Sequence, residues 1–119
     1  MRGRDFEQLV EQAIAALPSR FRRQLRNVVF IVENEPPRPG LLGLYEGRPL
    51  TERSFAQAAS MPDRITIFQG PHERDARSTA ELRSNVEETV WHEVGHYFGM
   101  DERSALRAER RRAAARRRL

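Results

Sequence analysis

Residues 91–102 read WHEVGHYFGMDE, and the expected architecture of the chain follows from this stretch. His92, Glu93 and His96 form the pattern HExxH, and Gly99 comes three residues later. Two histidines four residues apart on a helix lie one turn apart on the same face. Their ring nitrogens can then bind one metal ion at about 2.0–2.1 Å. Glu93 is placed to hydrogen-bond a metal-activated water and to act as its general base.

The plainer interpretation is an amphipathic helix that carries two histidines and ends at Gly99. Against it, the chain has only three histidines, and two of them lie in this motif. The spacing therefore predicts a metal site on a helix.

A third metal ligand is expected just after this helix, because catalytic zinc sites usually have three protein ligands and one open position. Gly99 is suited to reverse the chain, so the residues after it can return toward the metal. In the pattern HExxHxxGxxH/D the third ligand lies ten residues after the first histidine, which is Glu102 here. We prefer Glu102 on register, and Asp101 directly before it is the alternative. Without the histidines, these two acids would indicate only a solvated turn or a cap for the next helix.

The helix that carries the motif is predicted to begin at Ser78 or Thr79, with Glu81 completing a capping box. Its buried face repeats at helical spacing. That face is expected to consist of Leu82, Val86, Val90, Val94 and Tyr97 or Phe98.

Two further helices are predicted in the first quarter of the chain. Residues 5–16 have helical apolar spacing, with Asp5 as the expected N-cap. Ser19 is expected to cap a shorter helix through about Leu25, and the arginines around it form a solvated side. A phosphate-binding patch is the alternative for those arginines.

Three strands are predicted, over residues 27–33, 41–45 and 64–69. The first is nearly all apolar and is therefore expected to be central in its sheet. Residues 51–63 have weak periodicity and are expected to form a loop.

His72 falls in residues 70–76, which the Gly70–Pro71 pair predicts to be a loop. The third histidine of the chain could be a metal ligand, a substrate contact or a solvated loop residue. We prefer the solvated loop residue.

Composition limits the class of protein. A chain of 119 residues is long enough for one domain with a modest core. No run of about 18 apolar residues is present, and the first residues lack the apolar region of a signal peptide, so we expect no membrane segment and a cytoplasmic location. Without cysteine, any zinc must be held by nitrogen and oxygen atoms.

Charge is distributed unevenly along the chain. Residues 103–119 hold eight arginines and one acid, a charge of +7, whereas residues 1–102 hold 13 arginines and 16 acids, a charge of −3. We expect a domain over residues 1–105 and an arginine-rich tail over 106–119. The tail is interpreted as a solvated terminus, with an acidic partner or nucleic acid as the alternative.

The order and spacing of three segments resemble those of the small zincin-like metallopeptidases, a bacterial family. The segments are LLGLYEGRPL, PDRITIFQGP and TVWHEVGHYFGMDER. The resemblance covers roughly residues 5–105. It implies an α/β (α+β) fold, a single compact zincin-like domain with a small mixed sheet of three to four strands, an active-site helix and N-terminal helices. The family pattern HExxHxxGxxD carries over to His92, Glu93, His96 and Gly99, but this chain has Glu102 where the pattern has Asp.

The function expected from these features is zinc-dependent hydrolysis of peptide bonds in a peptide or protein substrate, with Zn²⁺ activating water and Glu93 as the base. The third strand is expected to offer its edge to an extended peptide. Two alternatives remain. One is a degenerate zincin that binds metal or a partner without turnover, and the other is a zinc-dependent endoribonuclease of the HxxxHxxGxxH type.

Overall fold

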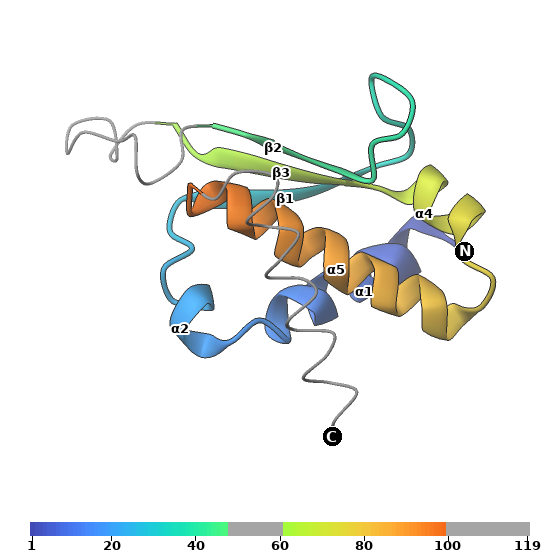
Figure 1. Ribbon diagram of the computed structural model, residues 1–119, viewed down its shortest axis with the longest axis horizontal. Helices are drawn as coiled ribbons and strands as arrows, with labels where there is room; N and C mark the ends of the chain where they lie inside the picture. The colour runs from blue at the N-terminus through green and yellow to red at the C-terminus, as the bar shows by residue number, and fades with distance from the viewer. Residues whose placement is uncertain (48–60, 100–119) are drawn as a thin grey trace.

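The computed structural model describes residues 1–47 and 61–99. These residues form an α+β fold in which a small sheet packs on helices (Figure 1). The elements, in chain order, are α1 (Gly3–Ala15), α2 (Ser19–Arg22), β1 (Val28–Glu33), β2 (Gly43–Glu46), β3 (Asp63–Phe68), α4 (Gln69–Asp75) and α5 (Thr79–Tyr97). The predicted α+β fold, with a small mixed sheet and several helices, is confirmed.

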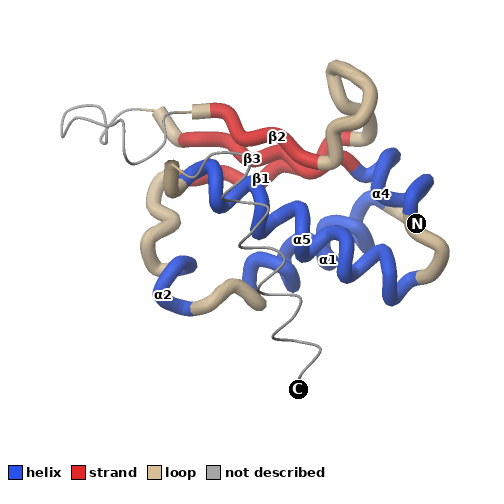
Figure 2. Tube along the Cα trace, viewed as in Figure 1, coloured by secondary structure: helices blue, strands red, loops and turns tan. Residues whose placement is uncertain are grey.

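The sheet has three strands in the order β1-β3-β2. β1 runs parallel to β3, with Phe30 opposite Ile65, and β2 runs antiparallel to β3, with Tyr45 opposite the same Ile65. β3 is therefore the central strand. Figure 2 shows α5 and α1 lying together against one face of this sheet.

The core lies between the sheet and these two helices. Ile65 and Ile67 of β3 are fully buried there. They meet a cluster of apolar side chains from α1 and α5 that includes Phe6, Leu9, Val10, Leu82, Val86, Val90 and Val94. The predicted apolar faces of both helices are thus confirmed.

Two predictions about strands are wrong. The strand predicted over 27–33 was expected to be central, but β1 lies at an edge of the sheet that the described residues form, and its Val29 is 43% exposed. The strand predicted over 64–69 was expected to offer an edge, but β3 pairs on both sides. An apolar run indicates burial of a strand but does not determine its place in the sheet.

The ends of the first two helices also differ from the predicted ones. α1 begins at Gly3, so Asp5 lies in its first turn and Arg2 is the N-cap. α2 is a single turn that ends at Arg22 rather than Leu25, and its N-cap is Pro18. The predicted loop over 51–63 and the arginine-rich tail over 106–119 fall mostly or wholly outside the described residues. No helix of the described part is long and apolar enough to cross a membrane.

Candidate metal centre

α5 carries the HExxH motif and is fixed at both ends. At its start, the hydroxyl oxygen of Ser78 accepts a hydrogen bond from the backbone N–H of Glu81 at 3.1 Å. The Glu81 carboxylate accepts one from the backbone N–H of Arg77 at 3.3 Å, one residue before the position that a capping box uses. At its end, Gly99 has a φ of 85°, as predicted for a residue that reverses the chain.

Aromatic contacts hold the last turns of α5 against α2. The ring of Phe21 packs edge-on against Trp91, with centroids 5.3 Å apart, and against Phe98, at 5.6 Å. On the other side, Tyr97 packs against Tyr45 of β2. The turns that bear the histidines are therefore held from both sides, which reduces their freedom to rotate.

His92 and His96 lie side by side, as the spacing predicts. Their Nε2 atoms are 3.2 Å apart, and both residues are partly exposed. Two nitrogens 3.2 Å apart, each about 2.05 Å from a metal ion, would subtend about 103° there, close to the tetrahedral angle. The pair therefore fits one shared zinc ion. The same distance also suits a hydrogen bond between the rings when one Nε2 carries a proton.

Glu93 lies next to this pair but turns toward the sheet, and the residue is 7% exposed. Its side chain lies against the backbone of Gly43, at the start of β2: a Cβ added to Gly43 would be 3.1 Å from Glu93 Cγ and 3.3 Å from Oε2. The side chain of the candidate base therefore lies between α5 and Gly43, the first residue of β2.

His72 is not a solvated loop residue, so that prediction is wrong. It lies on α4 and is fully buried. Its Nδ1 is 2.9 Å from the carbonyl oxygen of Phe68, and its Nε2 is 2.9 Å from the hydroxyl of Thr89. Both ring nitrogens are thus engaged, which leaves neither for a metal ion. Burial lowers the pKa of His72 below its ordinary value of 6.5.

The candidates for the third ligand, Asp101 and Glu102, lie outside the described residues. Within residues 1–47 and 61–99, no group of three or more His, Cys, Asp or Glu side chains is arranged to hold a metal ion. The described residues thus bring His92 and His96 together, and the choice between the two acids stays a prediction.

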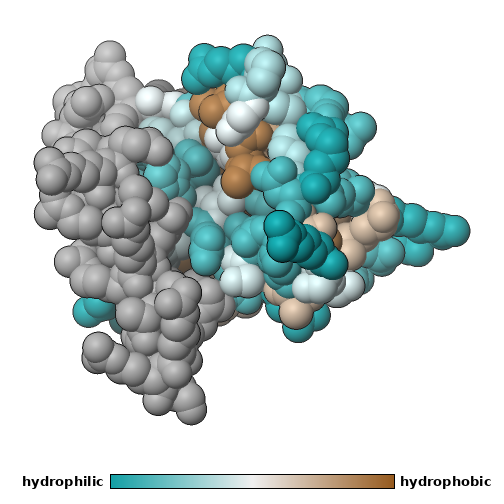
Figure 3. All heavy atoms as spheres, turned by 45° about the vertical axis from the view of Figure 1, so that its right-hand side comes forward, coloured by the Kyte–Doolittle hydropathy of each residue, from teal (hydrophilic) through white to brown (hydrophobic). Residues whose placement is uncertain are grey.

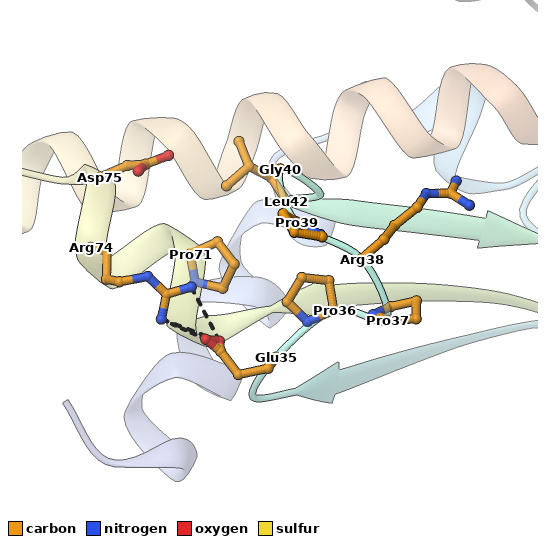
Figure 4. Close-up of a pocket in the computed structure, with 10 residues that line it drawn as sticks. All are labelled: Glu35, Pro36, Pro37, Arg38, Pro39, Gly40, Leu42, Pro71, Arg74 and Asp75. Carbon is orange, nitrogen blue, oxygen red and sulfur yellow. Dashed lines mark hydrogen bonds and ion pairs between the residues drawn. The ribbon is translucent and has the colours of Figure 1, made fainter.

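A separate hollow of about 450 Å³ lies beside α4 and the loop that leads into β2 (Figure 4). Pro36, Pro39 and Pro71 line it, and Arg74 closes one side through an ion pair with Glu35. Figure 3, which turns this end of the molecule forward, shows a described surface that is mostly hydrophilic, with small separate apolar areas.

A family profile described as zincin-like metallopeptidase matches residues 25–111. The chain belongs to the zincin-like metallopeptidase family. The segment that this family member shares with the profile includes the three strands, α4, α5 and the HExxH motif.

A solved structure is also similar to this chain. It is a conserved hypothetical protein from Thermo thermophilus, with 27% sequence identity and a TM-score of 0.56. The alignment covers 82% of this chain and 94% of that one. No curated protein matches the chain.

Sequence reasoning missed Gly43, Thr89 and the buried role of His72. The available signal was the glycine within a predicted strand, which often marks a place where other atoms approach the backbone closely. Nothing in the pattern identified Glu93 as the group that approaches it, because residues 43 and 93 are brought together only by the tertiary fold.

Proposed function

We propose that this chain is a zinc-dependent metallopeptidase in which His92 and His96 bind the metal and Glu93 is the general base. Either Glu102, which we prefer, or Asp101 would be the third ligand. The observation that carries the proposal is the 3.2 Å separation of the two Nε2 atoms with Glu93 between them in sequence. Membership in the zincin-like metallopeptidase family supports the same reaction class.

The chemistry would be divided between the metal and the protein. When bound, zinc would act as a Lewis acid toward the scissile carbonyl and lower the pKa of water toward about 7. Glu93 would take the proton of the attacking water and pass it to the leaving amine. Its low exposure keeps bulk water away from the carboxylate.

The substrate would be an extended peptide laid along β2. β3 cannot accept it, because that strand is already paired on both sides. β2 pairs only with β3 among the described strands, and its Gly43 adjoins Glu93. A peptide added to the other side of β2 would gain backbone hydrogen bonds beside the proposed base.

The test is Glu93→Gln, which keeps the size of the side chain and removes its basicity. We expect hydrolysis of fluorescein-labelled casein to fall by at least about 100-fold, because general base catalysis contributes about 10²–10⁴-fold. Bound zinc, measured by elemental analysis of the same samples, should stay at the wild-type level.

Two results would count against the proposal. Undiminished hydrolysis by Glu93→Gln would remove Glu93 from the reaction. Zinc binding by the wild type with no cleavage across a peptide library would instead favour a metal-binding module without turnover.

A further inference from the structure

The backbone conformation at Gly43 does not require a glycine. It is buried at the first position of β2, and its φ lies outside the left-handed region that only glycine adopts easily. Gly40 and Gly47, which flank it in sequence, do have positive φ values of 88° and 151°. The requirement at Gly43 must therefore concern space rather than conformation.

The space beside Gly43 is filled by two side chains of α5. A Cβ built on Gly43 would lie 2.7 Å from Thr89 Cγ2, 3.1 Å from Glu93 Cγ and 3.3 Å from Glu93 Oε2. The two carbon–carbon separations, to Thr89 Cγ2 and Glu93 Cγ, are shorter than the 3.5–4.0 Å at which carbon atoms pack optimally. Thr89 and Glu93 are one turn apart, so together they occupy the notch that the missing side chain leaves.

Thr89 is the fixed wall of this notch. Its hydroxyl oxygen lies 3.0 Å from the carbonyl oxygen of Asn85 and 2.9 Å from His72 Nε2. Two partners for one hydroxyl select one χ1 rotamer, and that rotamer turns the methyl group toward Gly43. Since Thr89 is 7% exposed, the methyl group has little room to move elsewhere.

Glu93 is the other occupant, and it has a flexible side chain that would yield first if the notch were filled. A displaced Glu93 carboxylate would move relative to His92 and His96, which are held on a neighbouring stripe of the same helix. We propose that Gly43 is a positioning residue for Glu93: the absence of a side chain there lets the Glu93 carboxylate lie against the start of β2, on the helix that bears the histidine pair. This inference rests on the proposed function for its catalytic consequence.

The test places Gly43→Ala in a Thr89→Ser background. Thr89→Ser removes the methyl group that is 2.7 Å from the new Cβ and keeps the hydroxyl that bonds His72 and Asn85. The main remaining close contacts are then those with Glu93, at 3.1 and 3.3 Å. Comparison of the double variant with Thr89→Ser alone isolates the effect on Glu93 from general loss of packing.

The first readout is the position of Glu93 itself, in the chain without added metal. The side-chain carboxyl carbons of ¹³C-glutamate-labelled protein are followed by NMR, and the Glu93 signal is assigned as the one lost in Glu93→Gln. We expect this signal to move in the double variant while the signals of distant glutamates stay in place. An unmoved Glu93 signal would overturn the inference, whether or not the wild type cleaves any substrate.

The second readout is turnover of fluorescein-labelled casein by the zinc-loaded chain. We expect kcat to fall by about 10- to 100-fold with KM little changed, because misplacing a catalytic group by about 1 Å can cost about 10²-fold. Zinc content should equal that of Thr89→Ser. An unchanged kcat, or a loss of zinc together with activity, would contradict a positioning role. If the wild type showed no turnover, the proposed function would be wrong. The NMR measurement would then still test whether Gly43 sets the position of the Glu93 side chain.

Gly3→Ala is the matched control for adding a Cβ to a glycine. A Cβ there would meet only Gln69 Oε1, at an ordinary 3.8 Å. It should leave the Glu93 signal and kcat at their wild-type values.

Discussion

His72 is bonded in either of its protonation states. In the neutral ring, Nδ1–H donates to the Phe68 carbonyl and Nε2 accepts from the Thr89 hydroxyl. In the protonated ring, both nitrogens donate, and the Thr89 hydroxyl donates to the Asn85 carbonyl instead. Burial has the largest effect and lowers the pKa of His72. The backbone carbonyls of Phe68 and Asn85 and the charge of Asp75 have smaller effects that raise it. The ring is therefore expected to be neutral at pH 7.

A lowered pKa in the folded chain makes stability depend on pH. Below the ordinary value of 6.5, the unfolded chain binds a proton on His72 that the folded chain resists, so the free energy of unfolding falls as the pH falls and levels off below the folded pKa. One such group gives a slope of at most about 1.4 kcal/mol per pH unit. We expect urea unfolding of the wild type to show this loss relative to His72→Gln.

The comparison with His72→Gln cancels the contributions of His92 and His96, because both proteins carry these two residues. If the two stability curves ran parallel between pH 5 and 8, the buried ring would not be the source of the pH dependence.

At the scale of elements, helices were predicted better than the sheet. The apolar stripe of α5 and its cap at Ser78 follow from local spacing and local hydrogen bonds, and both were found. α4 was missed because Gly70 and Pro71 were interpreted as the end of structure. Pro71 is the third residue of α4, where a backbone N–H has no helical partner to lose. Strand order was not predictable, because it depends on contacts between segments distant in the sequence.

The cap of α5 can be tested by Ser78→Ala. This change removes the acceptor for the Glu81 N–H and should lower the free energy of unfolding by about 1 kcal/mol, within the range of about 0.5–2 kcal/mol found for N-caps. Urea unfolding measures the effect. Ser78→Asp, which retains an acceptor, should lose much less. Equal losses in the two variants would indicate that the hydroxyl does not cap the helix.

Over the whole molecule, the sequence motif predicted which residues form the candidate centre but not what surrounds them. Four-residue spacing on a helix is enough to bring His92 and His96 together. The contact of Glu93 with Gly43 required the sheet to fold onto α5, and periodicity carries no information about that contact. The binding of an acidic partner or a nucleic acid by the arginine-rich tail remains a prediction, since the tail lies outside the described residues.

The central claim is that His92 and His96 share one zinc ion, and its most direct test is zinc stoichiometry in purified protein. The wild type and Glu93→Gln should each hold about one zinc ion per chain. His92→Ala and His96→Ala should lose it, whereas His72→Gln, which changes the remaining histidine of the chain, should keep it. Equal zinc in all five proteins, or loss on changing His72 alone, would contradict the site.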